Sequence, residues 1–431
     1  MAKSKKFNIR PSPTFNNMPK TPSLEDRVLN ASAVQKTIDA LAKRKSANGD
    51  NAQVREQLQK QAKDALETIT ANLNPLALAL VRPWEWLIIN FSFNGVEVHG
   101  FEQARPVLEA GQAVIACTHF SYYDLAALTN VLLGHGKNYY LGGDNVARPP
   151  APDLPFLKKA KANFVRWEFR NVGLVQIKRE VDIESFLRTK LELSYTLQLL
   201  MQGNNVATFA GNSDTGRYKS GEIPRFVSVF SSVFVSAARY AVPLSFTYTI
   251  VPEDEGFAHK TDEKHAGVES VSGLQRWDRA YGKIHVVFGK PIEMARYQAI
   301  SPGGIMPKSS IVSFQRDVNA ALVRQMTLTP VNLASVAAMD FLSGHRSQFS
   351  IGDIERTAFE LASEAKLAGV NLAPNLDPTK GVARALRYGA GKLAWRGALQ
   401  ATDSRYKVAD QAILEYYANH IRPTLHAFKI S

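Results

Sequence analysis

The stretch VIACTHFSYYDLAAL, residues 114–128, constrains the fold of this chain more than any other. Residues 114–117 form a short apolar run with β-branched members and predict a buried strand, while the apolar run 125–133 predicts a helix. On one continuous helix, side chains five positions apart would point roughly 140° away from each other. His119 and Asp124 can therefore meet only across a turn, which places His119 at the strand end and Asp124 in the first helical turn.

Two interpretations of this pair follow from the residues alone. In the first, the Asp124 carboxylate holds one imidazole nitrogen of His119 while the other nitrogen faces a substrate hydroxyl as a general base. In the second, Ser121 caps the helix with Asp124 three residues later, and His119 is an ordinary loop histidine. Both interpretations stay open at this point.

The pattern THFSYYD, with His119 and Asp124 separated by four residues, resembles block one of the glycerolipid acyltransferases. Further stretches resemble later blocks of that superfamily in the same order, with a closing strand and a Gly-x-Pro-Ile turn. They are VGLVQIKRE (172–180), TFAGNSDTGRYKSGEIPRF (208–226), VPLSFTY (242–248) and HVVFGKPIEM (285–294). Together these blocks make the resemblance specific for the superfamily.

The resemblance implies acyl transfer from a thioester to an alcohol, with His119 as the base and Asp124 holding it. VPLSFTY and the C-terminal LEYYANHI favour glycerol-3-phosphate as acceptor, giving lysophosphatidic acid in phospholipid biosynthesis. The donor would be acyl-CoA or acyl-ACP as co-substrate, with no other cofactor and no metal. The alternatives are a 1-acylglycerol-3-phosphate or other lysophospholipid acyltransferase and, in another class, a non-catalytic basic lipid-binding protein.

The acceptor phosphate requires cations and hydrogen-bond donors, and the resemblance places blocks two and three beside the active site. The predicted substrate-binding residues are Lys178, Arg179, Thr215, Gly216, Arg217 and Lys219. A solvated basic surface is the alternative. Block three departs from the usual Glu-Gly-x-Arg-Ser, because FAGNSDTGR lacks Glu and has Asp214 or Thr215 where Arg is expected. Backbone N–H groups near Ser121 are expected to bind the oxyanion.

The composition of the chain indicates which kinds of molecule it is expected to bind. A formal net charge of +13 favours anionic partners such as phosphate-bearing substrates or anionic lipid surfaces. Nucleic acid is not expected, since no helix-turn-helix, zinc or RNP pattern occurs. The single cysteine, Cys117, excludes an internal disulfide. Because Cys117 falls in the predicted buried strand, it is interpreted as a small hydrophobe rather than a nucleophile.

Residues 74–93 are the most apolar stretch and contain Trp84 and Trp86. They predict either a segment in a lipid interface or a buried helix followed by a strand. No signal peptide is visible, and no run of about 18 uncharged apolar residues occurs. We therefore expect a cytoplasmic protein peripherally associated with membrane. The basic start, without an acidic residue before Glu25, also allows a plastid or other organelle, or a solvated tail.

Alternation of strand and helix patterns from 96 to 294 predicts an α/β fold with a mixed, largely parallel central sheet flanked by helices. The expected organisation is a flexible lead-in (1–23), a helical N-terminal region (24–73), an α/β acyltransferase domain (74–300) and a helical C-terminal region (301–431). Beyond Pro302 only helices are expected, beginning at Thr329-Pro330 and at Ser350, with the last over about 405–421.

Overall fold

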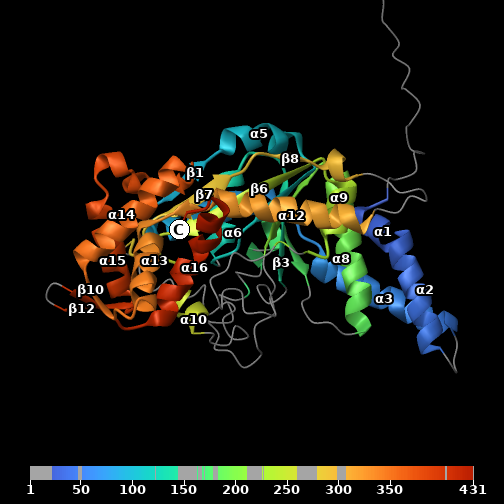
Figure 1. Cartoon of the computed structure of the whole chain (residues 1–431). Coiled ribbons are helices and arrows are strands. Elements are labelled where there is room, and N and C mark those ends of the chain that lie inside the picture. Colours follow the sequence, from blue (N-terminus) through green and yellow to red (C-terminus); the bar gives the residue numbers. More distant parts are fainter. Residues whose placement is uncertain are drawn as a thin grey trace, which may run out of the picture.

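A computed structural model of the chain (Figure 1) describes residues 22–46, 51–121, 123–143, 163, 167–168, 170–177, 183–210, 226, 228–259, 279–298, 307–402 and 405–430. The side chains of residues 183, 184 and 380 are not described.

The centre of the described structure is one sheet with strand order β1-β7-β6-β2-β5-β3-β4, and β8 pairs with β6. Its strands are β1 (Val96–His99), β2 (Ala113–Cys117), β3 (Asn138–Gly143), β4 (Leu174–Ile177), β5 (Asn205–Phe209), β6 (Tyr240–Tyr248), β7 (Ile284–Phe288) and β8 (Ile292–Glu293). Only the pairings of β6 with β7 and with β8 are antiparallel among these described strands. The predicted mixed, largely parallel sheet flanked by helices is confirmed.

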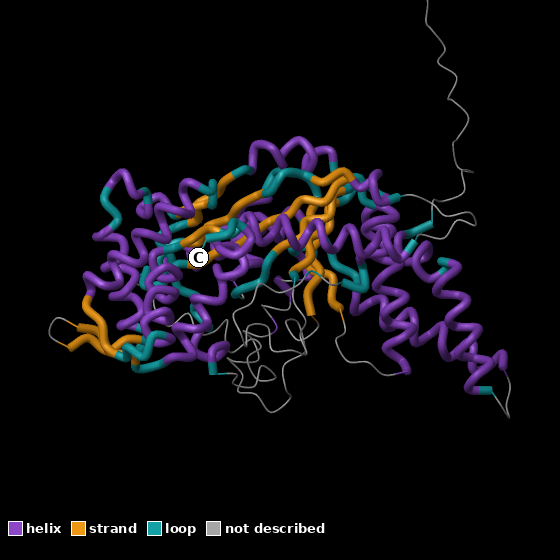
Figure 2. The backbone as a smooth tube through the Cα atoms, in the orientation of Figure 1, coloured by secondary structure: helices purple, strands orange, loops and turns teal. Residues whose placement is uncertain are grey.

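Helices cover both faces of this sheet (Figure 2), so the central strand β2 is fully buried at all five positions. Ile115 and Cys117 face a core shared with α6 (Tyr123–Leu132), whereas Val114 and Ala116 face a core shared with α8 (Ile183–Met201). A strand covered on both faces reads as a continuous apolar run, which explains the sequence pattern of this strand.

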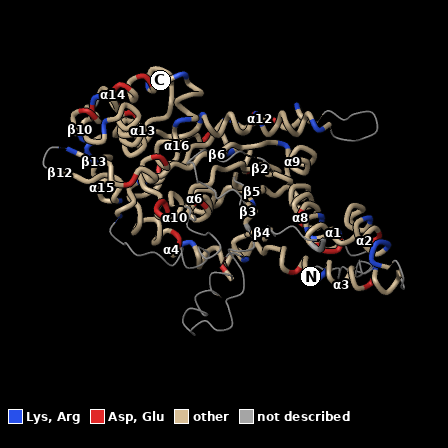
Figure 3. Tube along the Cα trace, turned by 60° about the horizontal axis from the view of Figure 1, so that its bottom comes forward, with Lys and Arg blue, Asp and Glu red and all other residues tan. Residues whose placement is uncertain are grey.

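The N-terminal helices lie at the end of the sheet far from the C-terminal helices (Figures 1 and 3). They are α1 (Leu24–Leu29), α2 (Ser32–Lys45) and α3 (Asn51–Ile69), and all three contact α8. The predicted apolar stripe of α3 is buried: Leu58, Ala62, Leu66 and Ile69. These residues form one buried face of α3, because side chains three or four positions apart lie on the same side of a helix.

Helix α4 (Pro75–Ser92) follows, with Asn74 accepting hydrogen bonds from the backbone N–H groups of Leu76 and Ala77. One side of α4 is buried and contacts α6, while Leu76, Leu80 and Trp86 are more than half exposed. The segment therefore combines parts of both predicted alternatives, a packed helix and an exposed apolar side. Among the described helices, none has the length and apolar character needed to cross a bilayer.

The remaining elements of the α/β part are α5 (Phe101–Ala110), α9 (Ser231–Ala237), α10 (Asp254–Ala258) and the 3-10 helix η4 (Met294–Tyr297). Helix α12 (Lys308–Gln325) contacts both β6 and α9, so it covers the face of the sheet that also carries α8. Ser245 of β6 donates a hydrogen bond to the Leu322 carbonyl of α12 over 2.8 Å, which ties that helix to the sheet.

The C-terminal helices are α13 (Pro330–Ser343), α14 (Ile351–Leu367), α15 (Ala383–Trp395) and α16 (Gln411–Ala427). The predicted starts of α13 and α14 are confirmed by capping boxes, in which Thr329 pairs with Asn332 and Ser350 pairs with Asp353. The buried stripe of α14 includes Ile354, Ala358, Leu361 and Ala365.

The prediction that strands stop after Pro302 is wrong. β9 (Thr327–Leu328) pairs with β11 (Asn371–Leu372), and β10 (Gln348–Ser350), β13 (Arg405–Val408) and β12 (Leu399–Thr402) form an antiparallel sheet. The start of the expected last helix is accordingly strand β13, and α16 begins at Gln411. These strands have two to four residues, too few for a period of two to stand out from the neighbouring helical pattern.

Candidate active site

The candidate site begins where β2 ends. Thr118 extends the pairing of β2 with β6, because its N–H donates to the Leu244 carbonyl over 3.0 Å and its Oγ1 accepts from the Phe246 N–H over 2.8 Å. His119 is the next residue, and its ring lies 5.0 Å from that of Phe209 at the end of β5. The carboxyl ends of parallel strands are where open α/β sheets place ligands, so His119 stands at the expected edge.

The predicted pair meets across a turn. His119 Nδ1 lies 2.7 Å from Asp124 Oδ2, with the Asp124 side chain fully buried and the His119 side chain 18% exposed. A carboxylate only accepts hydrogen bonds, so Nδ1 carries the proton and Nε2 is the basic nitrogen. The spacing of five thus brings the two side chains into contact, which is the geometry that a general base requires.

Asp124 also organises the turn itself. Its Oδ2 accepts hydrogen bonds from the backbone N–H groups of Phe120 and Ser121, at 2.7 and 3.1 Å. Ser121 Oγ accepts from the Tyr123 N–H over 3.2 Å at the start of α6. The capping interpretation and the catalytic interpretation are therefore not exclusive, because one carboxylate oxygen performs both tasks.

Four described backbone N–H groups near Ser121, where the oxyanion was expected to bind, are engaged within the turn. The N–H groups of Phe120 and Ser121 donate to Asp124, and that of Tyr123 donates to Ser121 Oγ. The Asp124 N–H in turn contacts the Ser121 carbonyl over 3.2 Å. Donors already engaged inside the turn are not available to a developing negative charge.

Tyr248 is a site residue that the sequence analysis missed. It is the last residue of β6, is buried, and its hydroxyl donates to Asp124 Oδ1 over 2.5 Å. Burial, with the nearby Asp124 charge, raises the pKa of Tyr248 well above its ordinary value, so the hydroxyl stays a donor. The signal was present in the alternation Val242, Leu244, Phe246, Tyr248, which puts Tyr248 on the same sheet face as Ile115 and Cys117.

Cys117 has the packing role that was expected. It is fully buried in β2, and burial raises the pKa of its thiol well above the ordinary value. Because the thiolate is the nucleophilic form, this environment disfavours a covalent acyl-enzyme on Cys117.

The predicted acceptor-binding residues cannot be placed. Lys178, Arg179, Thr215, Gly216, Arg217 and Lys219 all lie outside the described residues. The strands before them are described, since β4 ends at Ile177 and β5 ends at Phe209. Both strands run parallel to their neighbours in this half of the sheet, so they end at the same edge as β2.

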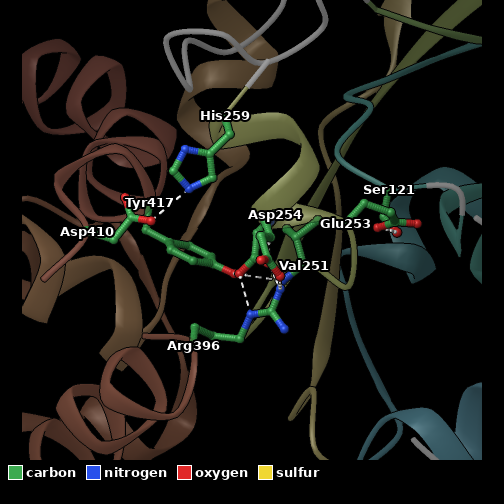
Figure 4. Close-up of polar contacts among 9 residues, drawn as sticks. Ser121, Val251, Glu253, Asp254, His259, Arg396, Asp410 and Tyr417 are labelled. Atoms are coloured by element: carbon green, nitrogen blue, oxygen red, sulfur yellow. Dashed lines mark hydrogen bonds and ion pairs between the residues drawn. The ribbon is translucent and has the colours of Figure 1, made fainter. Parts of the chain in front are cut away.

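The segment after β6 links the site to the C-terminal helices (Figure 4). Ser121 Oγ donates to Glu253 Oε2 over 2.8 Å, and the next residue, Asp254, is fully buried. The Tyr417 hydroxyl donates to Asp254 Oδ2 over 2.5 Å, and the Arg396 guanidinium contacts both carboxylate oxygens. The end of α15 and helix α16 thus hold Asp254, which follows the residue that contacts the His119–Asp124 turn.

Two further contacts complete this link (Figure 4). The Val251 N–H donates to the Tyr417 hydroxyl over 3.0 Å, and His259 Nε2 lies 2.7 Å from Asp410 Oδ2. Asp410 also caps α16 through its other carboxylate oxygen. Burial raises the pKa of Asp254 from its ordinary value, and the Arg396 guanidinium and the Tyr417 hydroxyl oppose that shift.

Comparison with known proteins adds to this geometry. Residues 95–247, which include β1 through β5, all but the last residue of β6 and the His119–Asp124 turn, match the model of the family described as Acyltransferase. The family match is to this part of the chain. The chain is also similar to the 1-acyl-sn-glycerophosphate (LPA) acyltransferase PlsC from Thermotoga maritima, with 14% sequence identity and a TM-score of 0.31. That alignment covers 66% of this chain and 91% of the Thermotoga chain.

Proposed function

We propose that this chain is a glycerol-3-phosphate 1-O-acyltransferase. It transfers a fatty acyl group from a thioester donor, acyl-CoA or acyl-ACP, to glycerol-3-phosphate and forms lysophosphatidic acid. The observation that supports this proposal is the 2.7 Å contact between His119 Nδ1 and Asp124 Oδ2 inside an acyltransferase-family domain. An imidazole held at one nitrogen by a buried carboxylate is suited to accept a proton at the other.

The reaction follows from this arrangement. His119 Nε2 accepts the acceptor hydroxyl proton while the hydroxyl oxygen attacks the thioester carbonyl carbon, and a tetrahedral intermediate forms. Its collapse breaks the carbon–sulfur bond, and the imidazolium returns the proton to the leaving thiolate. The products are an ester and a free thiol, and the Asp124 charge stabilises the imidazolium between the two steps.

The acceptor phosphate is assigned to Lys178, Arg179, Thr215, Gly216, Arg217 and Lys219. What supports this assignment is the sequence position of these residues, which follow strands that end at the same sheet edge as β2. Guanidinium and ammonium groups with loop N–H groups are the donors that phosphate binding uses.

Peripheral membrane association from the cytoplasm is proposed through residues 74–93. The support is the exposed apolar side of α4, where Leu76, Leu80, Trp84, Trp86 and Phe91 are between 40% and 69% exposed. Tryptophan beside aliphatic residues is typical of a helix that lies in a membrane interface.

The experiment that tests the function measures thiol release from an acyl thioester in the presence of glycerol-3-phosphate. His119→Ala should lower the rate by about a hundred- to ten-thousand-fold, because general-base catalysis contributes that much. Asp124→Asn should also lower it strongly, since an amide can donate to Nδ1 and favours the wrong tautomer. Cys117→Ala serves as the control and should keep most of the activity. Wild-type rates in His119→Ala would contradict the proposed mechanism.

The alternative acceptor is tested with the same assay. Replacing glycerol-3-phosphate by 1-acylglycerol-3-phosphate, at equal concentration and with the same donor, should give a much lower kcat/KM. The product from glycerol-3-phosphate should be lysophosphatidic acid by mass spectrometry. A higher kcat/KM for the acylated acceptor would assign the chain to the lysophospholipid acyltransferases instead.

A further inference from the structure

Three potential metal ligands meet at the β1 edge of the central sheet. Glu97 and His99 are two residues apart on β1, so both side chains point to the same face of the sheet. His285 of β7 is the direct cross-strand partner of Glu97 in the parallel register. Their donor atoms, two imidazole nitrogens and one carboxylate oxygen, all lie within 4.8 Å of one another.

Two of these donor atoms are buried and adjacent. His285 Nδ1 and Glu97 Oε2 lie 3.0 Å apart as an ion pair, and this contact lowers the pKa of Glu97. The His285 side chain is only 2% exposed. Two ligand atoms that each lie about 2.0–2.2 Å from one zinc ion are themselves roughly 3 Å apart, so this spacing suits a shared ion.

Of the two carboxylate oxygens of Glu97, one contacts a lysine and the other can bind an ion. Lys283 Nζ contacts Glu97 Oε1, which fixes the carboxylate and keeps Oε2 directed toward His285. His99 is exposed at the open side of the cluster, so an ion can enter from solvent. The arrangement is therefore closed on the His285 side and accessible on the His99 side.

This cluster is distinct from the candidate active site. Ile284, Val286 and Phe288 of β7 pack in the core that also contains Leu128 of α6, on the face where His119 meets Asp124. Because side chains alternate along a strand, His285 points to the opposite face. Two strands, β7 and β6, also separate β1 from β2 in the sheet.

We propose that Glu97, His99 and His285 bind a zinc ion. Imidazole nitrogen and carboxylate oxygen are ligands that zinc prefers, and two histidines with one carboxylate leave a fourth position for water. The bound ion would replace the direct contact between Glu97 and His285 and tie the edge strand β1 to β7. The positive charge of Lys283 opposes the ion, so affinity is limited by this neighbour.

The test is a zinc titration of the full chain after removal of metal by a chelator and of any affinity tag. Binding of one equivalent of zinc is expected, measured by competition with a chromophoric indicator. Binding of cobalt(II) at the same site should give visible absorption typical of low coordination number. His99→Ala and Glu97→Gln should each weaken zinc binding by at least about tenfold, since even indirect perturbation of a ligand has effects of that size.

The matched control is His135→Ala. His135 Nδ1 also lies 3.0 Å from a glutamate oxygen, that of Glu109, but no third donor is grouped beside this pair in the described part of the chain. His135→Ala should therefore bind zinc like the wild type, and Lys283→Met should bind it more tightly. The proposal is overturned if the wild type binds less than one equivalent, or if His99→Ala and Glu97→Gln, folded by circular dichroism, bind zinc unchanged.

Discussion

Both carboxylate oxygens of Asp124 make hydrogen bonds within the candidate site. Its Oδ2 contacts His119 Nδ1 and two backbone N–H groups, while its Oδ1 accepts from Tyr248. A carboxylate with every direction engaged is held in one orientation, and the imidazole it contacts is held with it. The orientation of the His119 imidazole thus depends on residues beyond the His119–Asp124 pair.

Tyr248→Phe tests this positioning at the residue scale. The substitution removes the hydroxyl that donates to Asp124 Oδ1 and leaves the buried ring in place. We expect kcat to fall roughly tenfold, because hydrogen bonds to charged groups are worth about 1.5–3 kcal/mol. The acidic limb of the rate profile should also move to higher pH, since a less-neutralised carboxylate favours the protonated imidazole. An unchanged pH profile would mean that Tyr248 acts by packing alone.

At the scale of elements, α4 has an exposed apolar side and a buried side that contains one carboxyl group, that of Glu85. Trp84 and Trp86 are 42% and 55% exposed, whereas Glu85 between them is buried and accepts a hydrogen bond from Thr129 of α6 over 2.9 Å. The two sides make separate predictions, one for binding to lipid and one for stability.

The exposed side predicts binding to anionic liposomes. The wild type should sediment with vesicles that contain anionic lipid at low salt, and partly dissociate at high salt because ions screen the attraction of basic residues. Trp84→Ala combined with Trp86→Ala should weaken sedimentation, because both indoles lose their contact with the interface. Trp167→Ala, which removes a 42% exposed tryptophan outside α4, is the control. Equal sedimentation of the double variant would exclude α4 as the contact.

The buried side predicts a pH dependence of stability. Burial, with a contribution from the nearby Glu168 carboxylate, raises the pKa of Glu85 to about 8. Between pH 4.5 and about pH 8, Glu85 therefore keeps its proton in the folded chain and loses it in the unfolded chain. Stability from this group is present below the unfolded pKa and is lost as the pH rises toward 8.

Thermal denaturation at pH 5 and pH 8 measures this effect. Glu85→Gln should raise Tm relative to the wild type more at pH 8 than at pH 5, because glutamine cannot ionise on unfolding. Glu56→Gln, at an exposed position of α3, should change Tm equally at both values. The same Tm difference for Glu85→Gln at both pH values would refute the assignment of a protonated carboxyl group.

At the scale of the whole molecule, the C-terminal helices support the segment that contacts Ser121. Arg396→Ala should lower the free energy of unfolding by about 3–5 kcal/mol, because the fully buried Asp254 would lose its cation. Arg387→Ala, in α15, removes the exposed partner of Glu355 in α14 and should leave the free energy of unfolding unchanged. Urea denaturation distinguishes the two variants, and equal midpoints would show that the buried pair does not stabilise the fold.

Some features of the site and the fold could be predicted from the sequence, and others could not. The five-residue spacing of His119 and Asp124 predicted the turn, because helix geometry excludes any other way for them to meet. The alternation along β6 indicates the sheet face on which Tyr248 lies, but no local pattern pairs Tyr248 with Asp124, which is 124 residues away. The short strand β13 was hidden for a related reason, since its pairing with β10 is what defines it.

The contact between Asp254 and Tyr417 spans 163 residues and has a consequence for synthesis. A ribosome adds about 5–20 residues per second, so Tyr417 emerges on the order of ten to thirty seconds after Asp254. During that interval the nascent chain contains the complete His119–Asp124 turn but lacks the helices that fix the segment beside it. The turn that carries His119 is made early, and the helices that fix the segment beside it follow later.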